Sequence, residues 1–135
     1  MKSKKNPVTM WWPTALTLTA VLWLTLAQDP TPDIEMPMLF PHVDKVVHAI
    51  MMGGLCGAAI FDYKRVTRPP RPVSRRFMVW LAVAMVAFSA ADELAQSAMG
   101  IGRAGDVLDF GADLAGVAFA LLAAPPVCNA LLPEK

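Results

Sequence analysis

The side chains best suited to chemistry in this 135-residue chain are charged groups placed at the ends of long apolar segments. Asp44, Lys45 and His48 open one such segment, and the spacing from Asp44 to His48 puts both on one helical face. A carboxylate beside an imidazole is suited to proton transfer or to metal ligation. The alternative is structural: Asp44 would favour a helix N-terminus, and Lys45 would extend to the lipid headgroups.

A second polar group closes the next apolar segment. Asp92 and Gln96 are four residues apart and share a helical face, and Glu93 is adjacent to Asp92. A carboxylic acid beside a second carboxylate is a candidate proton donor near neutral pH. The alternative is an ordinary helix end in the headgroups, although carboxylates at a helix C-terminus oppose the helix dipole and need a compensating partner.

A third group begins the last apolar segment. Asp106, Asp109 and Asp113 form one stripe of carboxylates along a helix, and Arg103 is the nearest counter-charge. Each acid would cost about 2.5 to 3.5 kcal/mol at the centre of a bilayer, so the stripe is hard to explain by chance. The alternative is a purely structural network in which Arg103, Lys45 and protonated His48 neutralise the acids.

The three groups predict one polar site. Its candidate catalytic residues are His48, Asp44 and Glu93. Its candidate ligand-binding residues are Lys45, Arg103, Asp92, Gln96, Asp106, Asp109 and Asp113. We expect no cofactor and no metal, because the established zinc spacings are absent; the alternative is a metal held by His48, Glu93 and Asp109.

The composition predicts a single membrane domain that positions this site. Apolar residues make up 56% of the chain and charged residues 17%, against about 25% in soluble domains. We predict an all-α protein with a bundle of four transmembrane helices at about 11–27, 43–61, 77–96 and 107–124. The last helix is expected to stop at Pro125 and Pro126, and 62–76 is expected to be a basic loop. A cleavable signal peptide is the rival interpretation of the first segment.

The distribution of positive charge predicts the orientation in the membrane. Six of the 12 Lys and Arg residues lie between positions 62 and 76, and three more lie in the first five residues. Lys and Arg in short loops stay on the cytoplasmic side, so both termini should be cytoplasmic and the polar site should face outward. The net charge of +1 does not indicate nucleic-acid binding. We expect a multi-pass protein of the bacterial cytoplasmic membrane, with membrane lipids as partners; the sequence does not determine its oligomeric state.

The ordered set of motifs resembles the VanZ-like membrane proteins. The resemblance covers about residues 44–116. Carried over position by position, the polar residues typical of that family fall on Asp44, Lys45, His48, Asp92, Glu93, Gln96, Arg103 and Asp109, with Gly116 as a packing glycine. Asp113 departs from the pattern, because relatives commonly have Asn there. The resemblance implies a general role in the cell envelope. The family takes its name from a member linked to resistance to a lipid-bearing glycopeptide antibiotic, and it has no established biochemical activity.

Three functions are compatible with these features. The first is binding of an envelope component, such as a lipid headgroup or a peptidoglycan-related or glycopeptide ligand, in which Lys45 and Arg103 contact an anionic group. The second is an enzyme at the membrane surface that uses a His–carboxylate acid–base or metal site on a lipid-linked substrate. The third is a proton-coupled transporter, for which four short helices leave little room.

Overall fold

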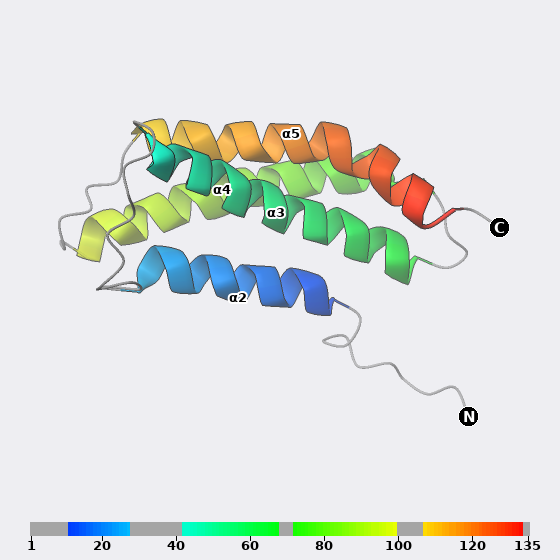
Figure 1. Cartoon of the computed structure of the whole chain (residues 1–135), viewed down its shortest axis with the longest axis horizontal. Coiled ribbons are helices and arrows are strands. Elements are labelled where there is room, and N and C mark those ends of the chain that lie inside the picture. Colours follow the sequence, from blue (N-terminus) through cyan, green and yellow to red (C-terminus); the bar gives the residue numbers. More distant parts are fainter. Residues whose placement is uncertain (1–10, 28–41, 68–71, 100–106, 134–135) are drawn as a thin grey trace, which may run out of the picture.

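The computed structural model of the chain describes residues 11–27, 42–67, 72–99 and 107–133. Within these ranges the chain forms four helices, α2 (Trp12–Leu26), α3 (Val43–Val66), α4 (Arg75–Met99) and α5 (Val107–Leu131). They lie side by side with alternating direction, so that α3 and α5 run one way while α2 and α4 run the other (Figure 1). The predicted all-helical fold is confirmed.

Three of the described helices, α3, α4 and α5, are long and apolar enough to cross a membrane. With 24 or 25 residues each, they extend roughly 36 Å at 1.5 Å per residue, which exceeds the ~30 Å of a hydrocarbon core. Helix α2 is apolar but has only 15 residues, or about 22 Å, and is slightly shorter than the predicted segment 11–27.

Helix α3 extends beyond its predicted end at residue 61, and the first part of the predicted basic loop is therefore helical. Asp62 lies in this extension and is fully buried, with its carboxylate bound to the Arg65 guanidinium at 2.9 Å. Lys64 is also buried. The extension is possible because no proline occurs between Phe61 and Pro69 and because basic side chains in a last turn complement the helix dipole.

The other two long helices also differ from the predicted bounds. Helix α4 begins two residues before the expected 77 and ends at Met99. Helix α5 does not stop at Pro125 and Pro126: both prolines lie inside it, and it turns downward towards its red end in Figure 1. A proline removes one backbone hydrogen bond, but its fixed φ is helical, and transmembrane helices tolerate such positions when neighbouring structure compensates. Cys128, which follows the prolines, is buried in the core.

Helices α3 and α5 touch at backbone level. A Cβ atom on Gly116 would overlap the carbonyl oxygen of Ala49, and a Cβ on Gly53 would lie 3.0 Å from the Gly116 carbonyl oxygen. Small residues at such contacts let helix backbones approach closely, as expected in a lipid environment. The position of Gly116 therefore requires glycine.

The outer surface of the bundle is strongly apolar. Trp23, Trp80, Phe119 and Leu122 each expose at least 64% of their surface. Apolar side chains on this scale face water only at cost, whereas they are suited to contact with lipid chains.

Candidate functional site

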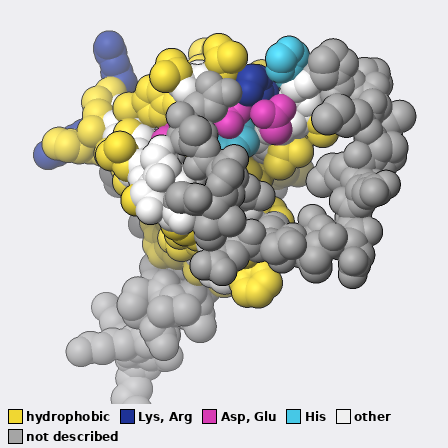
Figure 2. Space-filling view, turned by 90° about the vertical axis from the view of Figure 1, so that its left-hand side faces the viewer, with side chains coloured by type: hydrophobic (Ala, Val, Ile, Leu, Met, Phe, Trp, Pro, Cys, Tyr) yellow, Lys and Arg dark blue, Asp and Glu magenta, His cyan; other side chains and the backbone are white. Residues whose placement is uncertain are grey.

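The predicted polar groups meet at one end of the bundle. This is the end where α3 and α5 begin and α2 and α4 finish, on the left of Figure 1. Viewed towards this end, Figure 2 shows acidic, basic and histidine side chains gathered among apolar ones. Arg103 and Asp106, both predicted site residues, lie outside the described part of the chain.

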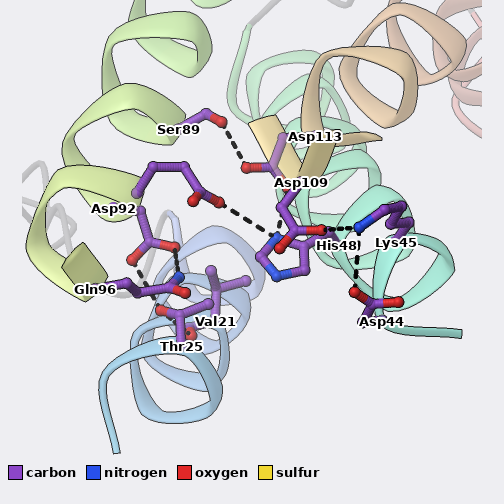
Figure 3. Close-up of polar contacts among 11 residues, drawn as sticks. Val21, Thr25, Asp44, Lys45, His48, Ser89, Asp92, Gln96, Asp109 and Asp113 are labelled. Carbon is purple, nitrogen blue, oxygen red and sulfur yellow. Dashed lines mark hydrogen bonds and ion pairs between the residues drawn. The ribbon is translucent and has the colours of Figure 1, made fainter. Parts of the chain in front are cut away.

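Asp113 on α5 is the buried centre of this polar cluster. Its side chain is fully buried; one carboxylate oxygen lies 3.0 Å from Nδ1 of His48, and the other accepts a hydrogen bond of 2.5 Å from the Ser89 hydroxyl (Figure 3). Three helices thus supply one hydrogen-bonded chain. Asp113 is the predicted site residue that departs from the VanZ-like pattern, and Ser89 was not predicted to belong to the site.

Glu93 joins the same group from α4. Its carboxylate lies 3.9 Å from Nδ1 of His48, on the same ring nitrogen that faces Asp113. The three residues each offer one ligand atom, and these atoms all lie within 4.8 Å of one another. His48, Glu93 and Asp113 are therefore the described residues that could hold a metal ion. The alternative metal site predicted from the sequence had Asp109 as its third ligand, whereas the structure brings Asp113 to His48 and Glu93.

Asp92 forms a separate arrangement with α2. One of its carboxylate oxygens lies 2.9 Å from the Thr25 hydroxyl, and the other accepts a hydrogen bond of 3.1 Å from the Gln96 amide (Figure 3). The Thr25 hydroxyl is equally close to the carbonyl oxygen of Val21 in its own helix. The predicted pairing of Asp92 with Gln96 on one face is observed, whereas Thr25 was not predicted, since a threonine in an apolar helix usually bonds only to its own backbone.

Lys45 connects the starts of α3 and α5. Its Nζ lies 2.9 Å from a carboxylate oxygen of Asp109 and 3.2 Å from one of Asp44. The Lys45 and Asp109 side chains are mostly shielded, whereas the Asp44 side chain is 60% exposed. The structure thus pairs Asp44 with Lys45 and pairs His48 with Asp113, where the spacing had suggested an Asp44–His48 pair.

The order of these contacts restricts the possible chemistry. In a serine hydrolase, the histidine takes the proton of the serine hydroxyl and the aspartate orients the histidine. Here the Ser89 hydroxyl donates to Asp113, so the acid stands between the serine and His48. The Ser89 hydroxyl therefore has a carboxylate as its acceptor in place of the His48 imidazole, which is not the serine–histidine order of that mechanism. His48 itself can move protons: with a proton on Nδ1, the neutral ring keeps Nε2 as an acceptor.

An apolar groove begins beside this cluster. It lies between α3 and α5, has a volume of about 570 Å³ and starts at Val46, the residue after Lys45. Its walls are apolar side chains such as Ile50 and Phe119, and its lining includes Gly54 and Gly57. A Cβ atom at either glycine would meet no protein atom within 4 Å, so both positions could carry a larger side chain that fills the groove.

Comparison with known proteins gave no relatives. No protein-family model matches the chain, no curated protein matches it, and no solved structure matches it. The resemblance to the VanZ-like proteins stays a prediction from the sequence motifs.

Proposed function

We propose that the chain is a multi-pass protein of the bacterial cytoplasmic membrane with four crossings, both termini cytoplasmic and the polar cluster facing outward. Three helices of sufficient length and the concentration of basic residues around positions 62–76 support this orientation. The contacts of α2 support a fourth crossing. Thr14 bonds to Asp62 near one end of the bundle, and Thr25 bonds to Asp92 at the other.

The function that fits this geometry best is binding of an envelope lipid or lipid-linked ligand. The observation that carries the proposal is the position of the groove, which starts one residue after Lys45 and continues to Val127. The charged side chains at this end are suited to the headgroup of a lipid. The apolar groove next to them is suited to its acyl chain.

Each part of the ligand would have its own partner. Lys45, together with Arg103, would contact an anionic headgroup, and the carboxylates of Asp44 and Asp109 would hold the Lys45 ammonium in place. An acyl chain would lie in the groove. From Val46 to Gly57 the groove wall on α3 is about 16 Å long, which is enough for a dozen or so methylene groups.

The test separates the groove from the headgroup contacts. The full chain is purified in detergent, incubated with phosphatidylglycerol or phosphatidylcholine, and the bound lipid per chain is measured by native mass spectrometry. Gly57→Leu fills the groove and should reduce retention of both lipids several-fold. Lys45→Gln should reduce retention of phosphatidylglycerol more than that of phosphatidylcholine.

Matched controls exist for both changes. Gly111 is exposed, lies outside the groove and also has open space at its Cβ position, so Gly111→Leu should leave lipid binding unchanged. Arg76 is an exposed cation at the opposite end of the bundle, so Arg76→Gln controls for the loss of one positive charge. Equal lipid retention in Gly57→Leu and Gly111→Leu would disprove the proposal.

One observation favours a second candidate, an enzyme acting on a lipid-linked substrate. Nδ1 of His48 faces two carboxylates, Asp113 at 3.0 Å and Glu93 at 3.9 Å, in the cluster at one end of the bundle. Such a group can accept and return a proton during hydrolysis or transfer of a headgroup. Turnover of a lipid-linked substrate that is lost in His48→Gln while lipid binding persists would distinguish the enzyme from a binding protein.

A further inference from the structure

We propose that His48, Glu93 and Asp113 form a binding site for one divalent transition-metal ion, with zinc as the best-suited candidate. This inference goes beyond lipid binding and does not depend on it. It rests on the arrangement of three ligating side chains from three helices.

The donor atoms are spaced as a metal ion requires. A tetrahedral zinc ion with bonds of about 2.0 to 2.1 Å separates neighbouring ligand atoms by roughly 3.4 Å. Nδ1 of His48 lies 3.0 Å from Asp113 and 3.9 Å from Glu93, and all three atoms lie within 4.8 Å. Side-chain adjustments of less than about 1 Å would bring the donors to ligand distances.

The kinds of donor atom select the class of metal. One imidazole nitrogen and two carboxylate oxygens suit zinc, manganese or ferrous iron, and they do not suit the soft ions that prefer thiolates. Calcium and magnesium prefer all-oxygen sites with more ligands. Three protein ligands also leave one tetrahedral position for water or another small ligand.

The helices that carry His48 and Asp113 are in backbone contact beside these two donors. The residue after His48, Ala49, touches the backbone of Gly116, which lies three residues after Asp113 on α5. This backbone contact sets the spacing of α3 and α5 next to His48 and Asp113. Ser89 holds the second oxygen of Asp113, and such an outer hydrogen bond commonly orients a metal-ligating carboxylate.

Two of the three donor side chains are partly exposed. The His48 side chain is 13% exposed and that of Glu93 is 11% exposed, whereas Asp113 is fully buried beneath them. The site is therefore shielded, with a small part of two of its donor side chains exposed. An ion would enter past Glu93 and His48 and meet Asp113 at the bottom.

The experiment measures metal binding directly. The full chain in detergent is freed of metal with a chelator, and zinc chloride is then added in competition with a chromophoric chelator. We expect one high-affinity ion per chain. Substitution of cobalt for zinc should give visible absorption bands typical of a four- or five-coordinate ion, which a surface-bound ion would lack.

Variants of the three donors give the decisive comparison. His48→Ala, Glu93→Gln and Asp113→Asn should each weaken zinc binding by at least about 10-fold, and Ser89→Ala should weaken it by roughly 10-fold through Asp113. Asp92→Asn is the matched control, because Asp92 is a buried carboxylate adjacent to Glu93 that binds Thr25 and Gln96. Asp92 supplies no donor atom, so the zinc affinity of this variant should fall by much less than that of the three donor variants.

Zinc should also raise the unfolding temperature of the unmodified chain, because an ion that binds only the folded state stabilises it. The Glu93→Gln variant keeps the buried His48–Asp113 contact, so it provides a folded test even if Asp113→Asn does not fold. Absence of a stoichiometric ion, or the same zinc affinity in Glu93→Gln and Asp92→Asn, would overturn the proposal. Neither result would affect the lipid test, which reads out different residues.

Discussion

Asp62 accepts hydrogen bonds from both the backbone N–H and the hydroxyl of Thr14, at 2.9 and 2.7 Å, across 48 positions of sequence. The N–H belongs to the first turn of α2, where backbone donors lack partners within the helix. The carboxylate on α3 therefore caps a different helix. This contact explains why an acid is fully buried at the end of the bundle opposite the polar cluster.

Replacing Asp62 by Ala should strongly destabilise the bundle. The change leaves the Thr14 donors and the Arg65 guanidinium without their shared acceptor, which should cost about 1 to 3 kcal/mol. The free energy of unfolding can be measured by denaturant titration in mixed micelles. Asp44→Ala removes an exposed acid and should change it by less than about 0.5 kcal/mol; equal effects would show that the cap contributes nothing.

Replacing Gly116 by Ala should separate α3 from α5. The added methyl group would overlap the Ala49 carbonyl oxygen, so the helices must move apart at a cost of about 1 to 3 kcal/mol. Thermal unfolding in detergent would detect the loss. Gly111→Ala adds the same methyl group in open space and should be neutral or slightly stabilising.

Replacing Thr25 by Val should weaken the contact between α2 and α4. Valine keeps the shape of threonine but cannot donate to Asp92, so we expect a loss of about 1 kcal/mol. Thr19→Val is the control, because the exposed Thr19 hydroxyl donates only to the Ala15 carbonyl within α2 among the described contacts. A loss in Thr25→Val that is no larger than the loss in Thr19→Val would contradict the role of the Thr25–Asp92 bond.

The orientation in the membrane is accessible to chemical labelling. In a background in which Cys56 and Cys128 are replaced by Ala, a cysteine at position 44 should react with a membrane-impermeant maleimide on intact cells. A cysteine at position 76 should react only after permeabilisation, because the basic segment is expected on the cytoplasmic side. The reverse pattern would invert the topology and place the polar cluster inside the cell.

The all-helical fold could be predicted from the composition, because apolar runs of this length are typical of helices that cross a membrane. The ends of the helices were less predictable. The polar residues from Asp62 onwards predicted a loop. In the structure Asp62 binds Thr14 of α2, and this contact is compatible with the continuation of α3 as a helix. Pro125 and Pro126 predicted the end of the last helix. Helix α5 continues through them because its packing continues to Cys128, which offsets the backbone hydrogen bonds that the prolines cannot donate.

The site was predicted as a set of residues but not as a set of pairs. Helical periodicity predicted that Asp109 and Asp113 lie on one face of α5. It did not predict which side chain of another helix each carboxylate binds. Because α3 and α5 run in the same direction, successive residues pair in step: Lys45 with Asp109, then His48 with Asp113. The hydroxyl partners Thr25 and Ser89 carry no sequence signal that separates them from other hydroxyls in apolar helices.

Two hydrogen bonds, one near each end of α2, fix the position of this helix along the bundle. Thr14 and Thr25 lie about three helical turns apart, so both hydroxyls point to the same side of α2 and reach Asp62 and Asp92 together. Insertion of a single residue between them would rotate one hydroxyl by about 100° and break one attachment. The register of α2 is thus set by two hydroxyl groups, and the number of residues between Thr14 and Thr25 cannot change by one without the loss of one attachment.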